Sequence, residues 1–77
     1  MGRKPKDQEE QVSNRLEQLR VKAGISRQEL ADAVGVHYQT VGYIERGEYL
    51  PSLVLALRIA KTLGTKVEKI FAIEEEA

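Results

Sequence analysis

The most constraining feature of this chain is the spacing of small and apolar residues between positions 27 and 46. Ala31 precedes Gly35 by four residues, and Val41 and Ile44 follow that glycine by six and nine residues. A small residue lets a second helix approach the first, and a glycine accepts the positive φ of a tight turn. Two apolar residues one turn apart then pack the second helix on a core. The spacing therefore predicts two short helices that cross at a steep angle.

This pattern is typical of a helix-turn-helix, whose second helix lies in the major groove of DNA. The alternative is a helical hairpin with a purely structural role, because helices joined by glycine turns are common. The segments on either side of the pattern favour the first interpretation, as described below.

Composition narrows the class of protein. A chain of 77 residues has the length of one small domain, and with no Cys and one His (His37) it has little material for disulfides, metal sites or histidine catalysis. Its apolar stretches are too short for a membrane span or a signal peptide, so we expect a cytoplasmic protein, associated with the nucleoid if it binds DNA. The net charge is zero, yet residues 13–66 carry eight Lys or Arg against five Asp or Glu. A mildly basic domain permits contacts with phosphates.

Helix signals recur in the first half of the chain, and no strand pattern is evident. Ser13 is a plausible N-cap for a first helix that ends at Gly24. Ser26 and Glu29 predict a capping box at the start of a second helix, which ends at Gly35. The predicted inward residues of that second helix are Leu30, Ala31 and Val34.

Two further helices follow. The third begins at His37 or its neighbour and runs to about Arg46. The fourth has Ser52 as its predicted N-cap and ends at Gly64. The inward face predicted for the fourth helix consists of Leu53, Ala56, Leu57, Ala60 and Leu63.

A short fifth helix is predicted from about Lys66 to Ile73. Five helices on one core then form a single domain over residues 13–73. Residues 1–12 contain no apolar side chain between Met1 and Val12 and are interpreted as a flexible tail, and residues 74–77 as an acidic tail.

The sequence resembles the phage-repressor family of helix-turn-helix regulators, of the Cro-like or xenobiotic-response-element type. The resemblance covers residues 14–71 and rests on N-R-L-E-Q-L-R, S-R-Q-E-L-A-D-A-V-G-V, Q-T-V-G-Y-I-E-R-G, P-S-L and I-A-K-T-L-G in this order. The ending V-E-K-I-F is similar to that of small stand-alone members. The resemblance implies an all-α, compact five-helix lambda-repressor-like DNA-binding domain, with the helix-turn-helix formed by helices 2 and 3.

The resemblance also implies a sequence-specific regulator of transcription, a repressor that binds double-stranded DNA. We expect no cofactor, metal, membrane partner or small-molecule substrate. The alternative is an antitoxin or bridging-type module that uses the same fold to bind a protein. An enzyme is rejected, because there is no nucleophile beside a base, no glycine-rich phosphate loop and no suitably spaced carboxylate pair.

The third helix carries the expected base-reading residues, since turning its apolar side inward leaves the opposite side for DNA. Gln39 can form two hydrogen bonds with adenine N6 and N7, and Tyr38 can contact a thymine methyl group. Tyr43 corresponds to a family position that reaches base or backbone. The alternative for both tyrosines is a partly buried ring that covers the second helix. Gly42 departs from the family, in which a polar side chain is usual, so either the DNA approaches closely there or the position is not read.

Backbone contacts are expected on either side of these residues. Arg27 and Gln28 lie in the first turn of the second helix, whose free amide groups point toward a phosphate. The family places DNA contacts at the positions of Arg27 and Arg46. His37 is a candidate phosphate donor, with a simple capping role as the alternative.

Arg20 and Glu45 match a pair that, in the family, bridges the first helix to the end of the third. The resemblance therefore assigns them a structural role as an ion pair. In a partly buried pair, loss of one partner leaves an uncompensated charge.

A homodimer on a palindromic operator is expected, because one recognition helix reads only a few base pairs. Val54 and Leu55 lie beyond the inward face predicted for the fourth helix, and Phe71 and Ile73 end the fifth. We expect Phe71 and Ile73 to form a dimer contact. The alternative is that these residues complete the core of the monomer.

Overall fold

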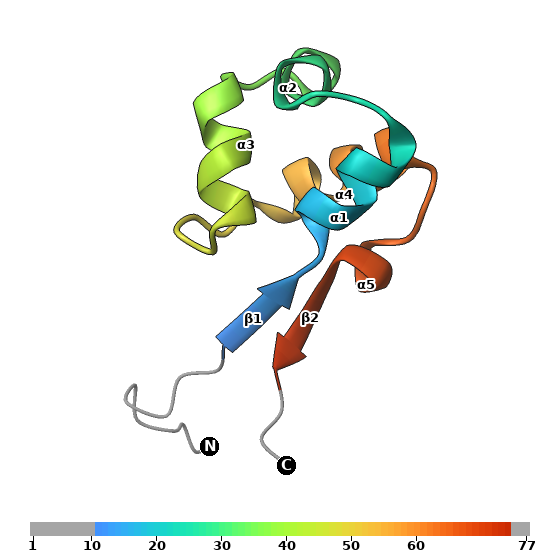
Figure 1. The fold of residues 1–77 in the computed structure, drawn as a ribbon. Helices are drawn as coiled ribbons and strands as arrows, with labels where there is room; N and C mark the ends of the chain where they lie inside the picture. The colour runs from blue at the N-terminus through green and yellow to red at the C-terminus, as the bar shows by residue number, and fades with distance from the viewer. Residues whose placement is uncertain (1–10, 75–77) are drawn as a thin grey trace.

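The structure, a computed structural model, describes residues 11–74 as five helices and a two-stranded antiparallel sheet (Figure 1). In chain order the elements are β1 (Gln11–Asn14), α1 (Leu16–Ala23), α2 (Arg27–Val34), α3 (Tyr38–Glu45), α4 (Leu53–Leu63), α5 (Val67–Ile70) and β2 (Phe71–Glu74). The first four helices gather at one end of the molecule, and the sheet projects from them beside α5 (Figure 1). Of the tails predicted at 1–12 and 74–77, residues 1–10 and 75–77 lie outside the described residues.

The predicted helix-turn-helix is formed by α2 and α3. Ala31 and Val41 are fully buried and Ile44 nearly so, and all three belong to the main core. Gly35 ends α2 with a φ of 82°, the left-handed conformation that the turn requires. The lambda-repressor-like fold class predicted from the sequence is confirmed in its helical part.

Side chains cap the first turns of α2 and α4 where the sequence predicts them. Glu29 N–H donates to Ser26 Oγ (3.0 Å), and Ser26 N–H donates to Glu29 Oε1 (2.7 Å), which completes the capping box. Ser52 Oγ accepts from the backbone N–H of Leu55 at 3.1 Å. Each cap satisfies backbone donors that a helix leaves unpaired in its first turn.

The sheet corrects two sequence predictions. Ser13 is not an N-cap, because it lies in β1, and the fifth helix stops at Ile70 because Phe71 turns to extended backbone and starts β2. The register runs from Gln11 opposite Glu74 to Asn14 opposite Phe71, so the sheet includes residues on either side of the 13–73 range. Two four-residue strands from distant parts of the chain are too short for alternation to reveal either one.

Arg15 is the N-cap of α1 and makes no side-chain cap bond, but the side chain of Asn14, one residue earlier, bonds to the first backbone N–H of the helix. Asn14 Oδ1 accepts from Leu16 N–H at 3.0 Å, at the start of α1. Its Nδ2 donates to the carbonyl oxygen of Ile44 at 3.0 Å, near the end of α3. One side chain therefore ties the sheet, α1 and α3 together.

The inward face of α4 also differs from the prediction. Leu55, Ala56, Ile59 and Ala60 are buried, whereas Leu53 and Leu57 are 70% and 52% exposed. Leu55 therefore belongs to the core and not to surplus apolar surface. Most positions of α4 are apolar, so periodicity alone does not decide which side faces inward.

Replacing Asn14 should weaken the fold. Asn14→Ala leaves Leu16 N–H and the Ile44 carbonyl without their partner, and we expect the free energy of unfolding to fall by about 1–3 kcal/mol. Urea titration followed by circular dichroism measures the change. Ser13→Ala is the matched control, because the exposed Ser13 Oγ lies 3.4 Å from the Ala72 carbonyl oxygen and its loss should change stability by less than about 0.5 kcal/mol. Equal effects of the two substitutions would contradict this role for Asn14.

Candidate nucleic-acid interface

The outward side of α3 carries the side chains expected to read bases. Because Val41 and Ile44 point into the core, Tyr38, Gln39 and Tyr43 lie on the exposed side of the helix. Each of the two tyrosines is 45% exposed, so both rings are accessible rather than sealed against α2.

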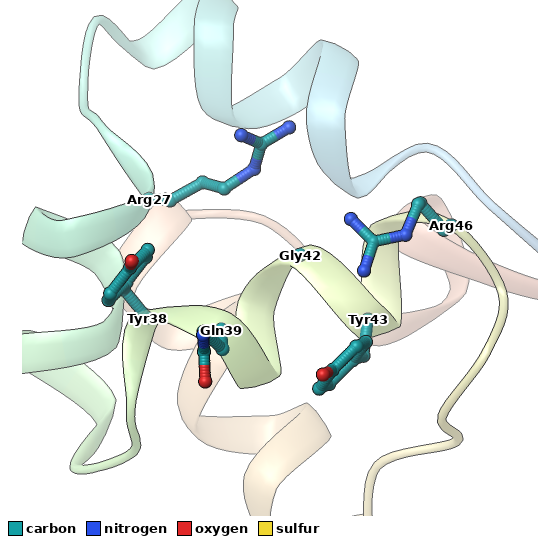
Figure 2. Close-up of a pocket in the computed structure, with 6 residues that line it drawn as sticks. All are labelled: Arg27, Tyr38, Gln39, Gly42, Tyr43 and Arg46. Carbon is teal, nitrogen blue, oxygen red and sulfur yellow. The ribbon is translucent and has the colours of Figure 1, made fainter.

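These residues surround a shallow pocket of about 260 Å³ (Figure 2). Arg27 reaches the pocket from the start of α2. Arg46, the residue that directly follows α3, also reaches it (Figure 2). Gly42 lies on α3 between the two guanidinium groups. Two cations beside one exposed helix create a positive surface suited to an anionic ligand. The complete lining is Arg27, Tyr38, Gln39, Gly42, Tyr43 and Arg46.

Arg46 lies back along α3 rather than away from it. Its guanidinium carbon is 5.2 Å from the centre of the Tyr43 ring, and its Nε donates to Glu48 Oε1 at 3.2 Å. A Cβ on Gly42 would lie 3.3 Å from Arg46 Nη1. The guanidinium therefore covers the position at which the family usually has a polar side chain, and Gly42 is buried beneath it.

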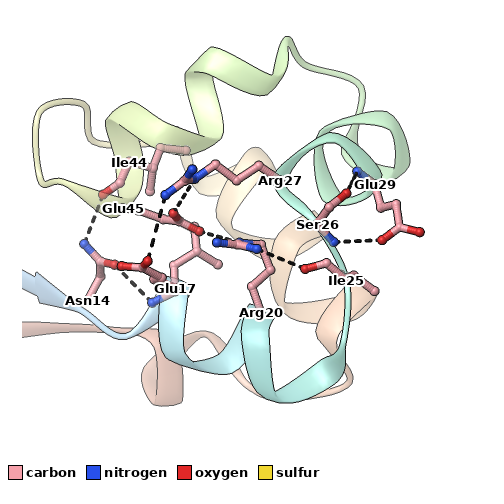
Figure 3. A network of polar contacts seen from close by, with 10 residues as sticks. Asn14, Glu17, Arg20, Ile25, Ser26, Arg27, Glu29, Ile44 and Glu45 are labelled. Carbon is pink, nitrogen blue, oxygen red and sulfur yellow. Dashed lines mark hydrogen bonds and ion pairs between the residues drawn. The ribbon is translucent and has the colours of Figure 1, made fainter.

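The Glu45 carboxylate is buried, with 2% of its side chain exposed. It lies at the centre of a network of polar contacts that includes Arg20 and Arg27 (Figure 3). Arg20 Nε donates to its Oε2 at 2.6 Å, and Arg27 Nε donates to its Oε1 at 2.8 Å. Arg20 also donates through Nη1 to the Ile25 carbonyl oxygen at 3.0 Å. The contact between Arg20 and Glu45 that the resemblance implies is thus present, and the structure adds Arg27 to it.

Arg27 combines this structural bond with an exposed surface, since 44% of its side chain is accessible. The hydrogen bond to Glu45 and the negative charge of that carboxylate raise the pKa of the Arg27 guanidinium above its ordinary value. Glu17, whose carboxylate lies 3.9 Å from Arg27 Nη2, adds to this effect. Arginine has five N–H donors in a planar fork. One of them holds Glu45, which fixes the plane of the group and leaves others at the pocket.

Gln28 and His37 occupy the two helix starts that face this surface. Gln28 Nε2 donates to Asp32 Oδ1 at 2.9 Å. His37 Nδ1 accepts from Gln39 N–H at 3.1 Å, so His37 caps α3, and its ring stacks on Tyr38 with centroids 5.0 Å apart. An accepting Nδ1 leaves the proton of a neutral imidazole on Nε2, where it is available to an oxygen ligand.

Sequence comparison decides the family. A helix-turn-helix family matches residues 16–70, which include all five helices. The chain belongs to this helix-turn-helix family. This regulator is 46% identical over 65 residues to YgzD of Bacillus subtilis, an HTH-type transcriptional regulator, and the match covers 84% of this chain and 98% of YgzD. A regulator of the same type from Archaeoglobus fulgidus is 42% identical, with 84% and 92% of the two chains covered.

A solved structure supports the same assignment. The restriction-modification controller protein C.AhdI from Aeromonas hydrophila superposes with a TM-score of 0.67 at 35% sequence identity. The match covers 70% of this chain and 82% of C.AhdI. The helix-turn-helix regulator is thus a DNA-binding transcriptional regulator and not an enzyme, as expected from its sequence.

Within residues 11–74, no helix has both the length and the apolar character needed to cross a membrane. The same residues contain no group of three or more His, Cys, Asp or Glu side chains placed to hold a metal ion.

Removing the buried carboxylate tests its structural role. Glu45→Ala should lower the free energy of unfolding by about 3–5 kcal/mol, because it leaves the Arg20 guanidinium buried without a counter-charge. Glu45→Gln keeps an acceptor and should lose less, which provides folded protein for DNA-binding measurements. Denaturant titration measures the stability of both variants.

Glu17→Ala is the control, since the exposed Glu17 carboxylate lies 3.9 Å from Arg27 and its loss should cost less than about 1 kcal/mol. Folded Glu45→Gln should keep the base preference of the original protein. Unchanged stability of Glu45→Ala together with an altered base preference of Glu45→Gln would show instead that Glu45 acts in recognition.

Proposed function

We propose that this regulator is a sequence-specific repressor that binds a palindromic operator as a homodimer, with α3 in the major groove. The observation that carries the proposal is the exposed side of α3, where two tyrosines and a glutamine line one pocket with two arginines. Polar side chains with a clear path to solvent can reach base edges, and the arginines supply charge for the backbone. Occupation of an operator excludes polymerase sterically, and DNA binding of this kind would locate the protein in the cytoplasm at the nucleoid.

Base reading is assigned to Gln39, Tyr38 and Tyr43. Gln39 is in the first turn of α3, the part of a recognition helix that approaches base edges most closely. Its amide offers one donor and one acceptor to adenine N6 and N7. Tyr38 is its neighbour and Tyr43 lies one turn further, so the three side chains span successive base pairs.

Phosphate contacts are assigned to Arg27, Gln28 and His37 on this side of the domain, with Arg46 as the further cation expected from the sequence. Arg27 and Gln28 open α2, whose first amide groups carry partial positive charge. The bond to Glu45 holds the Arg27 guanidinium in place, so less conformational entropy is lost when a phosphate binds.

Dimerisation is assigned to the apolar surface around the sheet, α4 and α5. Ile73 is 56% exposed on β2, and Leu53 and Leu57 are exposed on α4. Phe71, the other residue expected there, packs partly against the core and lines a groove with Val12. Apolar side chains left uncovered over neighbouring elements are typical of protein-protein contacts.

Two substitutions separate base reading from backbone binding. Gln39→Ala should cost about 1–3 kcal/mol on the selected operator and relax selectivity mainly at one base pair. Arg27→Ala should weaken binding to all duplexes by similar factors and make the slope of log affinity against log salt shallower by about 1. Fluorescence anisotropy on the operator and its single-base variants, at several salt concentrations, measures both effects.

Because Arg27 also contacts Glu45, its variant is compared only where thermal melting shows that it is folded. Gln28→Ala, which loses a bond to Asp32 but none to Glu45, serves as the second backbone variant. A uniform loss of affinity for Gln39→Ala would make Tyr38 or Tyr43 the principal reader. Salt-independent binding by the original protein would favour a protein-docking module instead.

Charge on the exposed apolar surface should dissociate the dimer. Ile73→Lys is preferred to a change at Phe71, because Phe71 also packs on the core. We expect sedimentation velocity to show a shift toward monomer and operator affinity to fall by at least tenfold, since both half-sites must be held together. Val21→Lys, on α1 and equally exposed, should change neither. A monomeric original protein, or a dissociated variant with full affinity for the palindrome, would contradict the dimer.

A further inference from the structure

We propose that Arg46 reads a guanine, and that Gly42 is a glycine because the Arg46 guanidinium occupies the space beside it. The inference rests on the proposed function, in which α3 lies in the major groove. It assigns Arg46 to base recognition instead of the phosphate contact expected from the sequence.

The backbone does not require a glycine at position 42. Gly42 lies in the middle of α3 and has no positive φ, unlike Gly35 or Gly47. Glycine inside a helix is less favourable than alanine, so the helical backbone gives no reason for it. The heavy atom that a Cβ here would approach is Arg46 Nη1, at 3.3 Å, and this atom would have to give way by a few tenths of an ångström.

The guanidinium is oriented by two neighbours. The Tyr43 ring lies under it at 5.2 Å, and Glu48 Oε1 accepts from Nε at 3.2 Å. With Nε held by Glu48, the paired Nη1 and Nη2 groups form the free end of the fork. Guanine presents two acceptors, O6 and N7, at its major-groove edge, and arginine is their commonest partner. Glu48 is therefore a positioning residue.

The position of the group along the helix fits a neighbouring base pair. Arg46 follows Gln39 by seven residues, about 10 Å of helix, but its guanidinium lies at the level of Gly42. Gly42 is three residues, or about 4.5 Å, from Gln39. With base pairs about 3.4 Å apart, the guanine should lie about one or two pairs from the one that Gln39 reads.

The exposed side of α3 offers the guanidinium a path to base edges. One side of the helix is formed by residues at positions i, i+3, i+4 and i+7, which all line the same pocket: Gln39, Gly42, Tyr43 and Arg46. A bulkier residue at position 42 would occupy that space and force Arg46 outward. The glycine and the arginine thus act as one unit.

Affinity measured on operator duplexes with each of the four base pairs at every position tests the inference. The original protein should prefer G·C at a position one or two pairs from that affected by Gln39→Ala. Arg46→Ala should lose about 5- to 100-fold on this operator and bind the four variants at that position equally. Replacing the guanine by 7-deazaguanine, which lacks the N7 acceptor, should weaken the original protein but not Arg46→Ala.

Substitutions at Gly42 provide an independent arm. Gly42→Leu should displace the guanidinium and remove the guanine preference, with no further loss when combined with Arg46→Ala. Gly42→Ala should have a smaller effect, because Arg46 needs to move by only a few tenths of an ångström. Both variants keep α3 helical, so their thermal midpoints should not fall.

Glu48→Ala tests positioning. It leaves the charge of Arg46 intact, so the preference for guanine should fall while affinity for unrelated duplexes stays equal or rises. A fall in both would show that Glu48 acts through stability rather than through Arg46.

The measurements distinguish failure of the guanine contact from failure of the proposed function. If Arg46→Ala weakens all duplexes by the same factor and makes the salt slope shallower by about 1, Arg46 contacts a phosphate and the inference is wrong, while the proposed function stands. If the original protein prefers no operator, the proposed function fails as well.

Discussion

The buried Glu45 carboxylate is the contact on which the arrangement of the first three helices depends. It is the last residue of α3, and it accepts from Arg20 of α1 and Arg27 of α2. A carboxylate removed from water needs such partners, because burial of an unpaired charge costs far more than a lost hydrogen bond. The geometry that satisfies Glu45 also fixes the angle between the three helices. The Arg27 side of the proposed DNA-binding surface is thereby set from inside the domain.

The neighbouring residue secures the same end of α3 through its backbone. The Ile44 carbonyl accepts from Asn14 Nδ2. Asn14 also accepts from Leu16 N–H at the start of α1, and it pairs with Phe71 in the sheet. The end of α3 is thus held by the sheet on one side and by two arginines on the other. The start of α3 is held by the His37 cap and by the packing of Val41. The backbone is therefore held at both ends of α3, which carry the proposed recognition residues.

Residue spacing was sufficient to predict the helix-turn-helix, because Ala31, Gly35, Val41 and Ile44 each meet a local requirement of two crossing helices. The sheet was not predictable in this way, since pairing between its strands depends on residues some sixty positions apart and on strands too short to show alternation. The inward side of α4 was misjudged where almost every residue is apolar.

The candidate site likewise has features that the sequence predicts and features that it does not. Exposure of Gln39 and the tyrosines follows from helix periodicity. The bond between Arg27 and Glu45, and the contact of Arg46 with Gly42, are side-chain arrangements between elements or across a helix end. No sequence spacing indicates them, although an unusual glycine in a recognition helix was a signal that something occupied its place.

The pairing of β1 with β2 has a kinetic consequence for the order in which the domain forms. Contacts among α2, α3 and α4 close short loops, whereas the sheet joins segments at opposite ends of the described chain. Closing a longer loop costs more chain entropy, so the helices should assemble before the strands meet. Asn14 can reach the Ile44 carbonyl only when β1 is in place. The C-terminal end of α3 would then acquire its hydrogen bond from Asn14 in the last step of folding, after Glu45 has joined it to α1 and α2.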